Sequence, residues 1–86
     1  MEIDGYKIED FANLSFATMP GADLTGTDLP GANLCDANLT KVNLIGANLQ
    51  GACMVSANLT GANLTGANME GADLTGTIMP DGTLHD

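Results

Sequence analysis

Large apolar residues recur at every fifth position from Leu14 to Leu84, and a small residue precedes each of them by two positions. These five-residue units, or pentads, fill residues 12–86 fifteen times without an insertion. The large residue at the centre of each pentad is always Leu or Met, and the residue between it and the small one is usually Asn or Asp. Small, polar, large is the inward, outward, inward alternation of a very short strand. The pattern predicts one three-residue strand in every pentad.

The other two positions of the pentad predict a sharp turn after each strand. Gly occupies the last position in nine of the fifteen pentads, and Pro precedes it at 20–21 and 30–31. A type II turn needs φ > 0 at its second central residue, which Gly adopts without steric cost, and it favours Pro just before. Where Gly is replaced we expect a different turn type or a strained corner. Apart from Asp86 at the chain end, these positions are Phe16, Asp36, Lys41, Ser56 and Asp81.

A continuous helix is excluded, because a period of five matches neither 3.6 nor 3.5 residues and because eleven Gly and three Pro would break it. Strands of three residues are also too short for a flat meander of hairpins. Stacked coils solve this problem, because each short strand pairs with the strand above and the strand below. The sequence therefore predicts a parallel β-solenoid.

The repeated units resemble those of the pentapeptide-repeat family. Residues 32–34, 47–49 and 62–64 all read Ala-Asn-Leu, the start of its Ala-(Asn/Asp)-Leu-x-Gly motif, and the resemblance covers 75 of 86 residues. It implies an all-β fold, a right-handed quadrilateral parallel β-helix with one pentad per face and twenty residues per coil. Residues 12–86 then make 3.75, or about four, coils, about 18 Å tall at a strand spacing of about 4.8 Å.

Stacking at twenty residues places the Leu and Met side chains in four interior columns, with Ala columns beside them. These side chains fill the axis, so we expect a dry core without an internal ligand cavity. In the fourth layer, Leu84 is expected to stack on Leu64. The core residues expected from this arrangement are Leu24, Leu34, Leu44, Leu49, Leu59, Leu64 and Leu74.

The chain divides into an N-terminal capping segment at residues 1–11 and a β-helix at residues 12–86. All three aromatic residues lie within the first sixteen positions, before the repeat or at its start. We expect them to fold over the first coil together with two isoleucines, with a single helical turn within residues 6–11. The residues of this expected cap are Ile3, Tyr6, Ile8, Phe11 and Phe16.

The C-terminal end has no comparable segment after Leu84. An uncovered solenoid end exposes unpaired strand groups and apolar core. Two arrangements remain open: the polar tail after Pro80 covers the last coil, or the end pairs with a second copy in an end-to-end homodimer.

The charge restricts the partners. Two basic and eleven acidic side chains give a net charge of −9, which argues against direct binding to nucleic acid or to an anionic membrane. The chain shows neither a run of about 20 apolar residues nor an apolar leader, so the cytoplasm is the expected location. The family resemblance implies an alternative, an acidic DNA mimic that modulates a type II topoisomerase such as gyrase. However, residues 37–69 contain no acidic residue, and no predicted face carries a continuous negative stripe.

We expect no catalytic, cofactor or metal site. A convex prism offers no water-excluding pocket to the acidic residues, and His85 stands alone, without Cys or His at metal-ligand spacing. Cys35 and Cys53 fall on one predicted face but in different columns, so that a disulfide would need adjustment. We therefore expect reduced, structural thiols.

The sequence favours a non-enzymatic structural or protein-interaction module that presents flat polar faces to an unknown protein partner. DNA mimicry and a role as a rigid spacer are the alternatives. The candidate partner-binding residues interrupt the Asn, Thr and Gly monotony, although scattered exposed apolar residues are normal on monomers. They are Ile45, Val55, Lys41 and Asp36.

Overall fold

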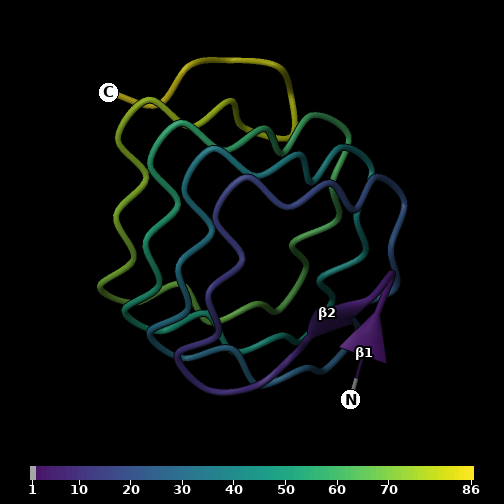
Figure 1. Cartoon of the computed structure of the whole chain (residues 1–86). Helices are drawn as coiled ribbons and strands as arrows, with labels where there is room; N and C mark the ends of the chain where they lie inside the picture. The colour runs from purple at the N-terminus through teal and green to yellow at the C-terminus, as the bar shows by residue number, and fades with distance from the viewer. Residues whose placement is uncertain (1) are drawn as a thin grey trace.

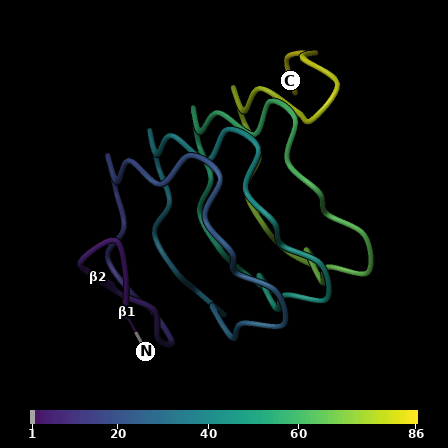
Figure 2. The ribbon, with the colours of Figure 1, turned by 90° about the vertical axis from the view of Figure 1, so that its right-hand side faces the viewer.

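The chain winds around one axis as a stack of four-cornered coils. The structure is a computed structural model that describes residues 2–86. Figure 1 shows the coils nested within one another, and Figure 2 shows them from the side, with a small hairpin at one end and the C-terminus at the other. The molecule measures 31 × 24 × 24 Å.

Parallel bridges between residues twenty positions apart connect the coils. The predicted register is therefore confirmed. The outward residues form four columns, which define faces 1 to 4 in chain order, with four layers on the first two faces and three on the others. The columns are Asn13, Asn33, Cys53 and Asp73; Thr18, Asn38, Asn58 and Ile78; Asp23, Asn43 and Asn63; and Asp28, Asn48 and Asn68.

The corners between faces have the predicted type II geometry. In the first corner of the coil the amide of Ala17 donates to the carbonyl of Leu14 at 3.0 Å, and the corner glycines have φ between 65° and 73°, as at Gly26 and Gly61. The non-glycine corners at Phe16 and Lys41 keep the same turn with φ of 62° and 60°. Strain is therefore correct at Phe16, Asp36, Lys41 and Ser56. At Asp81 the turn type changes instead, because Asp81 has no positive φ and the amide of Gly82 donates to the carbonyl of Met79 at 2.8 Å.

The outward Asn and Asp side chains hold the corners together. The amide of Cys35 donates to Oδ1 of Asn33 at 3.0 Å. Where the outward residue is Asp23, both the amide and the hydroxyl of Thr25 donate to its Oδ1, at 3.1 and 2.6 Å. This amide has no acceptor in the neighbouring coil, so the side chain satisfies a donor that the ladder leaves over. The preference for Asn, Asp and Thr is therefore a backbone requirement as well as a matter of surface polarity.

The core is apolar and its burial ends before the last coil. The side chains of Leu24, Leu34, Leu44, Leu49 and Leu59 are at most 1% exposed, whereas Leu64 and Leu74 are half-buried. Two threonines replace the small inward residue and stay satisfied, because their hydroxyls donate to carbonyls. These bonds join Thr27 to Leu24 at 2.8 Å and Thr77 to Met54 at 2.5 Å.

The N-terminal cap is a hairpin, and the helical turn expected within residues 6–11 is wrong. Strands β1 (Glu2–Ile3) and β2 (Tyr6–Lys7) pair antiparallel. Asp4 and Gly5 have φ of 53° and 85°, and two successive positive φ values make the tight hairpin turn that this two-residue loop needs. Ile8 is 7% exposed over the core.

Two members of the expected cap lie outside it. Phe11 and Phe16 are 77% and 74% exposed, whereas Ile3 and Tyr6 pack against the core. Phe16 occupies the last position of a pentad, and Phe11 occupies the equivalent position just before the first pentad. Both positions lie at a corner, and a side chain there points away from the axis. The phase of the repeat therefore overrides their hydrophobicity.

The last pentad leaves the coil, so the expected stacking of Leu84 on Leu64 is wrong. A turn at 79–82 reverses the chain, and Leu84 pairs antiparallel with Ile78 and is 67% exposed. The amide of Gly76 donates to the carbonyl of His85 at 2.9 Å, and the amide of His85 donates to Thr77 at 2.8 Å. The tail thus covers the end of face 2, and no later segment of residues 2–86 pairs with the last strands of the other three faces.

Candidate functional site

The edge between faces 1 and 2 differs from the other edges of the prism. The amide of Phe16 donates to the carbonyl of Cys35, and the amide of Asp36 donates to Val55, both at 2.9 Å, which stacks these corners in one column. Three of its four turn positions lack Gly. We call this column the irregular edge; its residues are Ser15, Phe16, Cys35, Asp36, Val55, Ser56, Thr75 and Gly76.

The irregular edge carries backbone strain. Phe16, Asp36 and Ser56 all have φ of 62°, in the left-handed region. A residue with a Cβ atom loses about 1 kcal/mol there relative to Gly, and a bulky residue is a clear outlier. Gly serves at nine equivalent corners of the same chain, so the fold itself does not demand Phe or Asp here.

Cys35 and Cys53 form a disulfide, and the expectation of reduced thiols is wrong. Their Cα atoms lie 5.9 Å apart, within the range that a disulfide spans. Cys53 pairs in the ladder with Asn33, and the corner that follows turns Cys35 back beside it. The two cysteines are diagonal neighbours in successive coils, a relation that a comparison of columns alone does not reveal.

The four candidate partner-binding residues do not form one surface. Asp36 and Val55 lie together on the irregular edge. Lys41 lies on the edge between faces 2 and 3, where its Cγ is 3.1 Å from the position that a Cβ atom at Gly61 would take. Ile45, 38% exposed, lies between faces 3 and 4, diagonally across the prism from Val55.

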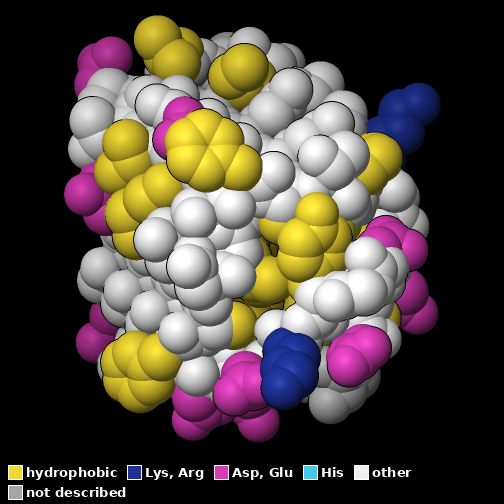
Figure 3. Space-filling view, viewed as in Figure 1, with side chains coloured by type: hydrophobic (Ala, Val, Ile, Leu, Met, Phe, Trp, Pro, Cys, Tyr) yellow, Lys and Arg dark blue, Asp and Glu magenta, His cyan; other side chains and the backbone are white. Residues whose placement is uncertain are grey.

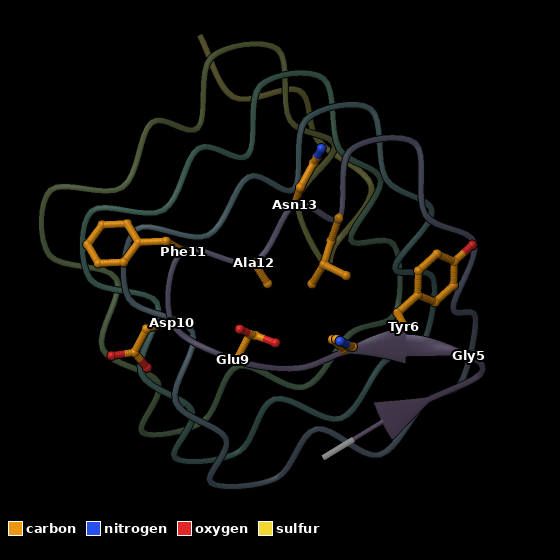
Figure 4. Close-up of a pocket in the computed structure, with 9 residues that line it drawn as sticks. Gly5, Tyr6, Glu9, Asp10, Phe11, Ala12 and Asn13 are labelled. Carbon is orange, nitrogen blue, oxygen red and sulfur yellow. The ribbon is translucent and has the colours of Figure 1, made fainter.

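Two aromatic residues add to face 1. Phe16 lies on the irregular edge, and Phe11 lies on the edge at the other side of the face. The ring of Phe11 covers Gly31, since a Cβ atom there would clash with its Cε1. Figure 4 shows the Phe11 ring directed outward from the coil. The exposure of both rings could have been predicted from the sequence, because Phe16 occupies the last position of a pentad and Phe11 the equivalent position before the first pentad, and both positions lie at a corner.

Acidic side chains surround the same face. Asp73 lies on it, Asp36 on one flank, and Asp10 and Glu70 on the other. Neither lysine joins them, because Lys7 is in β2 and Lys41 on another edge. Hydrogen bonds from the hydroxyl and the amide of Thr75 lower the pKa of Asp73, so its negative charge persists to lower pH. In the view of Figure 3 the Asp and Glu side chains lie mostly around the outline and the apolar ones form separate spots.

Two hollows lie at the capped end. One, of about 410 Å³, is lined by residues 5–7 and 9–14, and Glu9 points into it in Figure 4. Another, of about 510 Å³, lies beside Ile8 and Asp28. Both open to solvent. Residues 2–86 bring together no group of three or more His, Cys, Asp or Glu side chains that could hold a metal ion.

A family model for pentapeptide repeats, in eight copies, matches residues 12–54 and 43–81. The chain belongs to the pentapeptide-repeat family. Its coil is a right-handed quadrilateral β-helix, as the family resemblance implies. Pentapeptide-repeat proteins are generally non-enzymatic structural proteins. Across residues 2–86, no helix has the length and apolarity needed to cross a bilayer.

Solved pentapeptide-repeat structures resemble this one. Rfr23 from the cyanobacterium Cyanothece 51142 is 43% identical with a TM-score of 0.81, over 90% of this chain and 54% of that one. The protein alr5209 from Nostoc Pcc 7120 is 36% identical with a TM-score of 0.47, over 81% of this chain and 64% of that one. This chain therefore spans about half to two thirds of the length of these relatives. No curated protein matches it.

Proposed function

We propose that this pentapeptide-repeat protein is a rigid, non-enzymatic module that binds a protein partner along its irregular edge. The observation that carries this proposal is strain retained without a structural need, with Phe16 74% exposed in a left-handed conformation that Gly adopts elsewhere. Strain of this kind persists where function selects the side chain. An exposed aromatic ring on a rigid backbone is an effective anchor, because little conformational entropy is lost on binding.

The surroundings of Phe16 define the chemistry of the partner. Cys35 and Asp36 lie in the coil next to Phe16, Val55 lies one coil further along the same edge, and Asp73 lies in the fourth layer of face 1. The disulfide and Val55 supply apolar surface along this edge, and the two aspartates supply negative charge. The complementary surface has an apolar pocket for an aromatic ring, bordered by Lys or Arg side chains. Its binding weakens with added salt, because the charges that flank the ring are exposed.

The test separates stability from binding. Phe16→Gly and Asp36→Gly relieve the corner strain, so both raise Tm, and both remove side chains that contact the partner. Lys41→Gly relieves the same strain on another edge and is the matched control. A photoreactive amino acid at position 55 captures the partner in lysate of the native host, and calorimetry with the purified partner then gives Kd. We expect Phe16→Gly to weaken binding at least tenfold and Lys41→Gly to leave it within twofold.

Three outcomes contradict the proposal. Equal affinity of wild type and Phe16→Gly removes the irregular edge as the binding surface. Capture of a type II topoisomerase whose binding is lost in Asp23→Asn but not in Phe16→Gly supports the DNA mimic. Absence of any captured protein supports the rigid spacer.

We also propose that the open C-terminal end pairs with a second copy of this chain. Leu64, Met69 and Leu74 are half-buried there, and within residues 2–86 their amides have no backbone acceptor. An exposed strand edge over an apolar core is a template for further pairing.

Sedimentation analysis over a concentration series tests this pairing. Met69→Gln lowers the apolarity of the open end, and Ile45→Gln makes a similar change on a lateral edge as the control. We expect a concentration-dependent dimer that Met69→Gln weakens and Ile45→Gln preserves. A monomer at every concentration, with the circular dichroism of a folded chain, contradicts the proposal.

A further inference from the structure

We propose that Cys35 and Cys53 form a reversible thiol–disulfide exchange site that regulates the irregular edge. Its regulatory role rests on the proposed function, but the exchange site itself does not. The disulfide joins two successive coils, 18 residues apart in a repeat of twenty. It therefore closes a covalent ring around nearly one full turn of the core.

Reduction leaves the ladder around the disulfide intact. The amide of Leu34 donates to the carbonyl of Cys53 at 2.7 Å, and the amide of Cys53 donates to Ala32 at 2.9 Å. These bonds and the buried Leu34 side chain are independent of the sulfur atoms. The coil keeps its register in both redox states, which is the condition for a reversible reaction.

The disulfide is accessible to a reductant. Cys35 and Cys53 are both half-buried on the outer surface of a convex prism, so a thiolate can approach without opening the core. Disulfides that are reachable in this way are the ones that undergo exchange. In reducing compartments, where thiols are otherwise kept reduced, the disulfides that do occur are typically transient and redox-sensing.

The reductant is a small thiol, glutathione. Its thiolate attacks one sulfur of the pair, the bond between Cys35 and Cys53 breaks, and the released sulfur takes up a proton. A second glutathione thiolate then displaces the remaining cysteine from the mixed disulfide. Two glutathione molecules are oxidised to one disulfide, both cysteines become thiols, and two electrons have been transferred.

Reoxidation proceeds by exchange with another disulfide. A thiolate of the reduced pair attacks glutathione disulfide and forms a mixed disulfide, and one glutathione leaves as a thiol. The other cysteine then attacks the mixed disulfide, the second glutathione leaves, and the bond between Cys35 and Cys53 is formed again. Two electrons pass from the cysteine pair to glutathione disulfide.

The redox state acts on the edge through Asp36. This residue holds its strained φ of 62° between Cys35, which the disulfide fixes to the next coil, and the hydrogen bond of its amide to Val55. Reduction removes one of these two constraints, so the corner opens more often. A less preorganised edge binds its partner more weakly.

The experiment equilibrates the folded chain in glutathione buffers of varied ratio, blocks free thiols with a maleimide and determines the oxidised fraction by mass spectrometry. Hydrogen exchange is measured at the amides of Asp36 and Ser56 in both states. We expect complete interconversion with unchanged circular dichroism and exchange at least fivefold faster in the reduced form. Cys35→Ser with Cys53→Ser should exchange at the fast rate in every buffer.

A pair that stays oxidised in excess reduced glutathione overturns the exchange site, as does a pair that never oxidises. Equal exchange rates in the two states overturn the effect on the edge. These measurements need no partner, so they are separate from the docking test. If the pair cycles but the captured partner binds both forms equally, regulation fails and docking stands; if Phe16→Gly binds normally, docking fails and the exchange site stands.

Discussion

The two ends of the β-helix cover their apolar core to different degrees. At the N-terminal end, Ile8 and the hairpin cover the first coil, and Leu14 and Leu24 are 2% and 1% exposed. At the C-terminal end, Leu64 and Leu74 hold equivalent positions in the repeat but are only half-buried. Identical repeat residues thus have different burial, because each coil relies on its neighbours. The residues outside the repeat decide whether an end is stable.

The largest expected difference between the ends comes from a charge placed in each. Ile8→Asp places a carboxylate at a site that is 7% exposed, and we expect it to lower the free energy of unfolding by about 4 kcal/mol. Leu84→Asp changes a residue that is 67% exposed and should cost less than about 0.5 kcal/mol. Chemical denaturation followed by circular dichroism measures both. Similar losses in the two variants would show that the tail caps its end as well as the hairpin does.

Removal of the disulfide should lower the local stability of the coils between the disulfide and the C-terminal end. Loop-closure entropy predicts a loss of about 3 kcal/mol for Cys35→Ser with Cys53→Ser. Because the disulfide joins the second and third layers of face 1, we expect faster hydrogen exchange in the coils that follow it and little change at Leu14. Uniformly faster exchange along the chain would mean that the disulfide acts on global unfolding alone.

One side-chain hydrogen bond contributes to the stability of the N-terminal end. The hydroxyl of Tyr6 accepts from the amide of Thr18 at 3.2 Å and so completes the N-terminal edge of face 2. Tyr6→Phe keeps the ring and should lower the free energy of unfolding by about 1 kcal/mol. Thermal denaturation measures the change. The amide of Thr18 should then exchange faster, and an unchanged rate would assign its protection to burial.

The smallest expected effect is on pH dependence. Hydrogen bonds from Thr25 and from Thr83 lower the pKa of Asp23 and of Asp81 below the ordinary value of 3.8. A folded pKa below the unfolded one adds stability above the unfolded pKa, and this stability is lost as the pH falls through the folded value. Thr25→Ala and Thr83→Ala should move each titration upward in an NMR experiment, and the loss of stability relative to wild type should be largest above about pH 4 and should shrink as the pH falls through the folded pKa values. If the pKa values of Asp23 and Asp81 do not change in these variants, the hydrogen bonds from the Thr hydroxyls are not the cause of the lowering.

The regular part of the fold was predictable because each pentad repeats the same local requirements. The register of Asn13 on Asn33 follows once the family resemblance gives twenty residues per coil. The corner at Gly26 follows from the ability of Gly to adopt the positive φ that a type II turn requires. The remaining features depend on relations that a repeat does not contain. The disulfide joins diagonal neighbours, and the tail reverses at Pro80 before it can stack.

The candidate site was predictable only in part. Asp36 and Val55 stood out as interruptions of the repeat, and the structure brings them together on one edge. Ile45 stood out for the same reason, yet it lies two corners away. Phe16 was misassigned because its hydrophobicity suggested a capping role, although its place in the pentad indicated an exposed corner.

Because one pentad forms each face, the residue number fixes both the face and the layer of every side chain. A deletion of twenty residues moves every later side chain down by one layer and keeps it on the same face. A deletion of five residues turns everything that follows by a quarter, so that loss of residues 57–61 would carry Asp73 from face 1 to face 4. Insertions and deletions of whole pentads therefore rearrange the surface of such a protein and keep its interior positions apolar, and their length modulo twenty decides which side chains share a face.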